Sequence, residues 1–262
     1  MKHAFWYFDF ISPFAYLQNR RLHEFLDILS IERKPLLFAG LLKHWGTKGP
    51  VELPGKRLFT YRQVQWMAEH QDIPLWFPER HPFNPIPLLR LCVATGCSEL
   101  AVDGIFRCIW EEGRAGDDPG HWDAFCDAAG LTVAEAAERI SSPEVKAELK
   151  ANGEEALAGA VFGVPTLAIE GHLFWGCDST DLALDYLAHP GIFQTPAMKR
   201  LETLSGLKRN ASPEKTSEDT ILVQRKIQGA NFVERKEGEN AKNSTITLSG
   251  RIYPLFGIRA RF

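Results

Sequence analysis

Residues 8–16 of the 262-residue chain read FDFISPFAY and join a buried strand to the start of a helix. The residues just before, 4–8, are aromatic or apolar on both faces, which predicts a strand inside a covered sheet. Ser12 followed by Pro13 is typical of a helix N-terminus, because serine caps the first amides and proline suits the first helical position. The stretch therefore predicts a central strand that ends at a helix N-terminus.

The segments around this stretch predict the rest of the fold. An apolar stripe predicts that the helix continues to Leu29, and residues 31–38 read as a second strand, which gives a β-α-β opening. A hairpin over residues 167–175 and a helix over residues 180–188 return much later. We therefore expect an α/β protein, a thioredoxin-like fold with an all-α helical insertion at about residues 46–160. Within the insertion, helices are predicted over residues 56–70, 88–95, 99–112, 121–129, 132–140 and 142–160.

The C-terminal part of the chain differs in composition from the rest. We expect the thioredoxin-like domain to occupy residues 1–205. Residues 206–262 contain no Trp or Cys and only sparse β-prone runs, which predicts a tail that is mostly disordered or loosely packed.

Composition and charge exclude several classes of function. The net charge of −3 argues against nucleic acid or an acidic membrane surface as the main partner. No apolar stretch is long enough to span a membrane, and the first residues do not form a signal peptide. The five cysteines include no C-x-x-C pair, so we expect reduced thiols in a cytoplasmic protein. The histidines show no metal-binding spacing, and no glycine-rich loop predicts a nucleotide site.

Ser12 is the candidate catalytic residue. In redox enzymes of this fold a C-x-x-C motif stands at the strand–helix junction, and here its two cysteine positions are Ser12 and Ala15. Disulfide exchange is therefore impossible at this site, but a serine hydroxyl can still donate a hydrogen bond to a bound thiolate. Lowering a thiol pKa by one to two units takes about 1.4–2.8 kcal/mol, which a charge-assisted hydrogen bond and a helix terminus can supply. The alternative is that Ser12 only caps the helix.

A second candidate segment is Val164-Pro165-Thr166, just before a predicted strand. A cis Val164–Pro165 bond would leave the backbone of Val164 ready to pair with an extended, peptide-like ligand. The alternative is an ordinary trans proline that enters a strand.

The loop from Trp175 to Asp178, with Gly176 and Cys177 between them, is the third candidate segment. It could hold the two ends of glutathione, with Asp178 on the ammonium group, or Asp178 could simply cap the following helix. Cys177 has no basic partner beside it in the sequence, so we interpret it as a bystander.

Lys43 and Asn84 are weaker candidates for contacts with a substrate. Lys43 follows the second predicted strand and could meet a carboxylate, and the alternative is an ordinary solvated lysine. Asn84 lies among prolines, where it forms a turn that could line the cleft.

Taken together, the FDFISPFAY stretch, FGVPT at residues 162–166 and FWGCD at residues 174–178 resemble the 2-hydroxychromene-2-carboxylate isomerase family. This family has a DsbA-like thioredoxin fold and is related to the kappa-class glutathione transferases. The similarity runs over about residues 3–205, and the tail has no counterpart in it. The family often has Asn where this chain has Cys177, so a side-chain contact at that position is not implied.

The resemblance implies a glutathione-dependent isomerase of aromatic compound catabolism, with a small aromatic substrate, glutathione as cofactor and a possible homodimer. Ser12 would hold the glutathione thiolate, and Val164 and Pro165 with Trp175–Asp178 would bind the tripeptide. Lys43 would contact the substrate carboxylate. Two alternatives remain open, namely a kappa-class-like glutathione transferase and a redox-inactive thioredoxin-like module that binds peptides. Stoichiometric consumption of glutathione would identify the transferase, and absence of glutathione binding would identify the module.

Overall fold

The computed structural model describes residues 1–204, 245–248 and 251–254. Residues Met1–Thr203 form one compact unit, and Leu204–Phe262 form another. In the second unit, strands β5 (Thr245–Leu248) and β6 (Arg251–Pro254) pair antiparallel. The prediction of a loosely packed tail otherwise falls on residues outside the described ranges.

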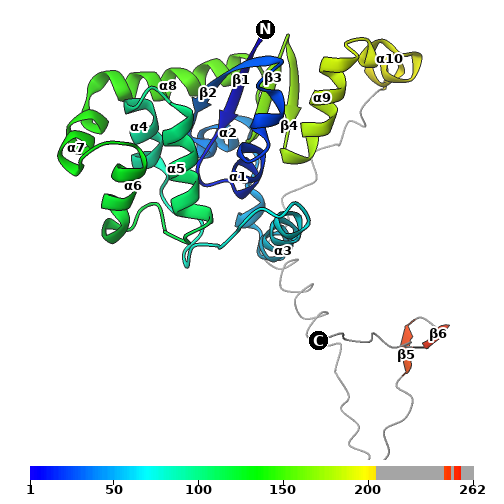
Figure 1. The fold of residues 1–262 in the computed structure, drawn as a ribbon. Helices are drawn as coiled ribbons and strands as arrows, with labels where there is room; N and C mark the ends of the chain where they lie inside the picture. Colours follow the sequence, from blue (N-terminus) through cyan, green and yellow to red (C-terminus); the bar gives the residue numbers. More distant parts are fainter. Residues whose placement is uncertain (205–244, 249–250, 255–262) are drawn as a thin grey trace, which may run out of the picture. The chain divides into compact units, whose positions relative to one another are not determined.

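A four-stranded sheet is the centre of the first unit (Figure 1). Its strands lie in the order β2-β1-β3-β4, and β1 runs parallel to β2 and antiparallel to β3. β4 returns antiparallel to β3 in the predicted hairpin. The bounds are β1 Lys2–Phe8, β2 Leu29–Pro35, β3 Thr166–Ile169 and β4 His172–Trp175. This mixed sheet confirms the α/β fold class.

Helices cover both faces of β1, as its continuous apolar sequence predicts. Trp6 and Phe8 point to one face, where their rings stack 4.4 Å apart and pack against Phe106. Tyr7 points to the other face, and its hydroxyl donates to Glu155 at 3.1 Å. Because both faces are buried, the C-terminal end of β1 is held rigidly between layers.

The opening helix is shorter than the apolar stripe predicted. Helix α1 spans only Pro13–Asn19, a single 3₁₀ turn follows at Leu22–Phe25, and β2 already begins at Leu29. Leu29 pairs with Lys2 of β1, so its burial belongs to the sheet rather than to a helix. β2 also ends earlier than predicted, at Pro35, and helix α2 (Phe38–Trp45) occupies the end of the expected strand.

The predicted helical insertion is present between α2 and β3. Figure 1 shows α4, α5 and α8 gathered on the β2 side of the sheet and α9 beside β4, and contacts of α4 and α8 with β2 and of α9 with β4 agree with this view. The insertion comprises α3 (Pro54–His70), α4 (Ile86–Ala94), α5 (Glu99–Trp110), α6 (Trp122–Ala128), α7 (Val133–Ser141) and α8 (Pro143–Ala158). Helices α9 (Thr180–Ala188) and α10 (Pro196–Glu202) complete the unit. Within the described residues, no helix combines the length and apolar character needed to cross a membrane.

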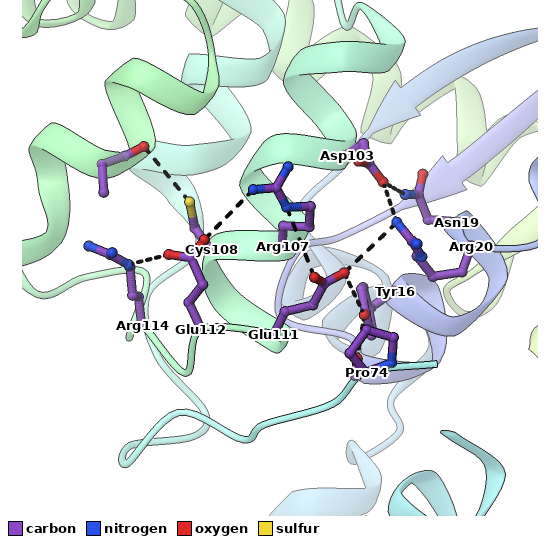
Figure 2. A network of polar contacts seen from close by, with 11 residues as sticks. Tyr16, Asn19, Arg20, Pro74, Asp103, Arg107, Cys108, Glu111, Glu112 and Arg114 are labelled. Carbon is purple, nitrogen blue, oxygen red and sulfur yellow. Dashed lines mark hydrogen bonds and ion pairs between the residues drawn. The ribbon is translucent and has the colours of Figure 1, made fainter. Parts of the chain in front are cut away.

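A polar network fastens α1 to the insertion (Figure 2). The Tyr16 hydroxyl lies 2.5 Å from the carbonyl oxygen of Pro74 and 3.0 Å from the carboxylate of Glu111. Arg20 reaches both Asp103, at 3.3 Å, and Glu111, at 3.8 Å. Burial and the charge of Glu111 raise the pKa of Tyr16, so its hydroxyl stays protonated as a donor. The network fixes the position of the helix that Ser12 caps.

Candidate functional site

Ser12 is the N-cap of α1, as the sequence predicts. Its Oγ accepts a hydrogen bond from the backbone N–H of Ala15 at 3.2 Å, and its own N–H donates to the carbonyl of Asp9 at 3.0 Å. The residue is 7% exposed. In the part of the chain that the structure describes, the Ser12 hydroxyl donates to no acceptor, so its hydrogen remains available to a ligand.

Asp9 holds the turn between β1 and Ser12 together. The side chain is fully buried, and its two oxygens accept N–H groups from Ile11 at 3.1 Å and Phe38 at 2.9 Å. Phe38 is the first residue of α2, so one carboxyl caps both the Ser12 turn and a helix 29 residues further on. Burial raises the pKa of Asp9 to about 7, and the two N–H groups oppose this rise.

Two ring N–H groups from the insertion hold the carbonyls just before Ser12. The indole of Trp110 donates to the Phe10 carbonyl at 3.0 Å, and Nε2 of His81 lies 2.8 Å from the Ile11 carbonyl. The other ring nitrogen of His81 lies 2.9 Å from the Tyr61 hydroxyl. Burial lowers the pKa of His81, which favours a neutral ring with its hydrogen on Nε2. The turn is therefore fixed from outside the thioredoxin core.

The Val164–Pro165 peptide bond is cis. Thr166, the next residue, pairs with Tyr7 in the antiparallel ladder, so Pro165 stands at the same edge of the sheet as the end of β1. Within residues 1–204, neither the N–H nor the C=O of Val164 makes a hydrogen bond. An unpaired main-chain donor and acceptor thus lie at the edge where the Ser12 turn begins.

Gln18 of α1 connects the three predicted segments. Its side chain is fully buried, donates to the carbonyl of Gly176 at 3.1 Å and accepts from the indole of Trp6 at 2.8 Å. The N–H of Gly176 in turn donates to the Pro165 carbonyl at 2.8 Å. The helix that starts at Ser12, the cis proline and the loop after β4 therefore form one hydrogen-bonded unit.

The loop after β4 depends on a glycine. Gly176 has φ of +90°, and a Cβ there would meet the Oδ1 atom of Asp178 at 2.3 Å. The Asp178 side chain is exposed, and Trp175 is 54% exposed beside Phe162. Cys177 is buried, and burial and the neighbouring Asp178 raise its pKa to about 12, so its thiol stays protonated.

Lys43 and Asn84 are not hydrogen-bonded to the Ser12 turn. Lys43 is exposed on the last turn of α2 and forms no ion pair with the described residues. Asn84 is exposed in the loop before α4, where its Oδ1 accepts from the N–H of Ile86 at 3.1 Å. Both side chains are accessible to a substrate, and their contact with it stays a prediction.

Four of the residues that hold the site in place are not predicted by the sequence patterns. They are Gln18, Tyr61, His81 and Trp110, each of which acts through a contact distant in the sequence. Of these four, Gln18 is the one that the sequence could have predicted, because a polar side chain among the apolar residues of a buried helix requires a partner.

Known proteins share the sequence and the fold that carry this site. The sequence matches the DSBA-like thioredoxin domain over residues 5–188, which is more than half of the chain. The chain belongs to the DSBA-like thioredoxin domain family. The predicted thioredoxin-like fold with a helical insertion is thereby confirmed. A solved 2-hydroxychromene-2-carboxylate isomerase resembles this DSBA-like chain with a TM-score of 0.64 and 23% identity, over 78% of this chain and 100% of that one.

Two curated relatives of this DSBA-like chain are enzymes with related names. The glutathione S-transferase kappa 1 of Homo sapiens is 27% identical over 70% of this chain and 88% of its own length. The 2-hydroxychromene-2-carboxylate isomerase of Sphingobium xenophagum is 26% identical over 69% of this chain and 95% of its own length. These names confirm the family resemblance seen in the three motifs and support an enzyme.

Proposed function

We propose that the protein is a glutathione-dependent isomerase of the 2-hydroxychromene-2-carboxylate isomerase type, acting on an intermediate of aromatic degradation. The observation that carries the proposal is the Ser12 hydroxyl. It accepts from the N–H of Ala15 and has no acceptor for its own hydrogen among the described residues. A group in that state can donate to a thiolate that arrives beside it. The isomerase names of the relatives support the reaction class.

The chain has groups suited to the main chain and the ammonium group of glutathione. The free N–H and C=O of Val164 match the main chain of an extended tripeptide, as in pairing at a sheet edge. The exposed carboxylate of Asp178 suits the ammonium group at the other end. The N–H of Gly176 donates to the Pro165 carbonyl, so the loop that carries Asp178 stays joined to the segment that carries Val164. Glutathione, when bound, supplies a sulfur nucleophile that can add to the conjugated substrate and leave again.

The side chains around this position have separate tasks. Ser12 stabilises the anionic sulfur by its hydrogen bond, and a decrease of one to two units in thiol pKa requires about 1.4–2.8 kcal/mol. Because α1 has only seven residues, most of this stabilisation falls on the Ser12 hydroxyl rather than on a long helix dipole. Lys43, exposed at the end of α2, would bind the substrate carboxylate, and Asn84 would line the same cleft.

A glutathione transferase of the kappa type is the second candidate function. Two relatives named glutathione S-transferase kappa favour it, at 26–27% identity against 26–28% for the isomerases. The same Ser12 contact serves both reactions. They differ in whether the sulfur leaves the product, so glutathione is recovered in the isomerase and consumed in the transferase.

Isothermal titration of the full chain with reduced glutathione tests the proposal, together with the ultraviolet absorbance of the bound thiolate. Ser12→Ala should weaken binding and abolish the thiolate absorbance. Ser98→Ala is the matched control, because Ser98 caps α5 through the same bond to the third amide, at 3.3 Å, at the opposite end of α5 from Trp110. Equal behaviour of the two variants would show that Ser12 is only a cap. Absence of wild-type binding at millimolar glutathione would reject both enzyme functions and favour a peptide-binding module.

A further inference from the structure

Two cysteines outside the Ser12 site meet at the C-terminal end of α4. The N–H of Cys97 donates to the carbonyl of Cys92 at 2.9 Å, and the N–H of Gly96 donates to that of Val93 at 2.9 Å. Gly96 has φ of +65°. These bonds form a Schellman motif, in which the side chains three positions before and two after the helix cap contact each other. In this chain both of those side chains are thiols.

The two thiols differ in access to solvent. The Cys97 side chain is half-buried, and its thiol lies near enough to that of Cys92 to raise the pKa of Cys92. Cys92 is fully buried, and burial raises its pKa well above the usual range. A reagent from solution can therefore reach Cys97 first, whereas Cys92 stays protonated until a reactive sulfur is placed against it.

A cationic side chain stands beside this pair. Arg33 of β2 lines a cavity of about 240 Å³ together with Cys97, Lys34 and Asn152. The guanidinium of Arg33 pairs with Glu99 at 2.9 Å, but its Nε is buried and has no partner among the described residues. The Arg33 charge favours the thiolate of Cys92, and the carboxylate of Glu148 opposes it more weakly. A cation with a free donor next to two neighbouring thiols is an environment that favours sulfur chemistry.

We propose that Cys92 and Cys97 are a dithiol site that low-molecular-weight disulfides, such as glutathione disulfide, oxidise to an intramolecular disulfide. The Cys97 thiolate attacks one sulfur of glutathione disulfide, forms a mixed disulfide and releases one glutathione thiolate. Cys92 then loses its proton and attacks the Cys97 sulfur, which forms the Cys92–Cys97 bond and releases the second glutathione thiolate. Two protein thiols are oxidised and one disulfide is reduced to two thiols, so electrons balance.

The reaction does not depend on the proposed isomerase function, because Ser12 takes no part in it. The Schellman motif supplies the closeness that the second step needs, since the bond from Cys97 to Cys92 holds the two main chains together. The pair is also separate from Cys108, Cys126 and Cys177, which are buried elsewhere.

The test treats the native full chain with glutathione disulfide, stops the reaction with acid, alkylates the remaining thiols and digests with trypsin. The peptide of residues 91–107 lies between two arginines and contains Cys92 and Cys97 as its two cysteines. In wild type this peptide should lose two hydrogens and carry neither an alkyl group nor glutathione. Mass spectrometry should find the Cys92→Ser variant with one glutathione on Cys97 and the Cys97→Ser variant with Cys92 still reduced. Cys126→Ser, a matched control, should react like wild type.

Three results would overturn the proposal. They are a wild-type peptide that keeps both thiols, a mixed disulfide on Cys97 that does not resolve, and a bond from either cysteine to another one. Circular dichroism would show whether each serine variant folds. If one does not, the wild-type peptide alone decides whether the proposal holds. Arg33→Gln should slow the loss of thiols several-fold, and an unchanged rate would remove Arg33 from the site.

Discussion

The Nε2 atom of His81 lies 2.8 Å from the carbonyl oxygen of Ile11, the residue just before Ser12. This carbonyl belongs to the same planar peptide unit as the N–H of Ser12, so the ring fixes the plane from which Ser12 projects. Tyr61, 2.9 Å from the other ring nitrogen, keeps the ring in place. The insertion thus determines the orientation of the candidate catalytic residue without touching its side chain.

Loss of the His81 donor should slow turnover more than it weakens glutathione binding. His81→Leu removes the hydrogen bond to Ile11 and loosens the Ser12 turn, so we expect kcat to fall about tenfold, equivalent to about 1.4 kcal/mol. His81→Gln, which can still donate from its amide, should recover most of the rate. Steady-state kinetics with glutathione and the aromatic substrate would measure the split between kcat and KM. A wild-type kcat for His81→Leu would contradict a positioning role.

Asp9 should make the protein less stable as the pH rises. Its folded pKa of about 7 is above the ordinary 3.8, so the native state keeps a proton that the unfolded chain releases. The contribution is fully present below about pH 4 and is lost as pH rises through 7, up to about 4 kcal/mol. Urea unfolding between about pH 4 and pH 8 should show this loss in wild type and in the exposed control Asp27→Asn, but not in Asp9→Asn. A constant difference between wild type and Asp9→Asn would refute the shift.

A pair of glycine variants should separate backbone strain from site geometry. Gly176 and Gly171 both have positive φ, +90° and +84°, so alanine at either costs about 1–3 kcal/mol of stability. Only at Gly176 would the new Cβ displace Asp178, since a Cβ at Gly171 meets nothing within 4 Å. We expect Gly176→Ala alone to weaken glutathione binding in a titration. Equal loss of affinity in both variants would argue against a role for Asp178.

Gln18→Met should destabilise the fold at nearly constant side-chain volume. It leaves the Trp6 indole and the Gly176 carbonyl without their partner in a buried place, at a cost of about 2–4 kcal/mol. Chemical denaturation would measure this cost, with Gln63→Met on the exposed side of α3 as the control. If Gln18→Met lost no more stability than Gln63→Met, water would have replaced the amide as the partner of both groups.

Local patterns were sufficient for the segments whose structure depends on neighbours in the sequence. Side-chain periodicity and capping chemistry predict three such segments. They are the covered strand of residues 4–8, the helix start at Ser12-Pro13 and the hairpin that ends at Trp175. For Val164–Pro165 the sequence leaves a cis and a trans bond open, and the structure has the cis bond.

The missed features depend on distant partners. Helix α2 has no side-chain cap of its own, because Leu37 precedes it and the cap for Phe38 comes from Asp9. No residue near Phe38 in the sequence indicates that a carboxylate 29 positions earlier caps the helix. The prediction of a helix up to Leu29 was wrong for another reason. The 3₁₀ turn and the strand that replace it place apolar residues at spacings that also fit a helix.

The carbonyls of Phe10 and Ile11 are held by Trp110 and His81, whose rings also contact each other with centroids 5.4 Å apart. This arrangement restricts how relatives of the chain could exchange parts. A chimera that grafts a foreign insertion onto this core would keep the turn before Ser12 only if both ring donors arrive with it, at the same separation. The FDFISPFAY stretch, the loop that carries His81 and the end of α5 must therefore be inherited as one unit.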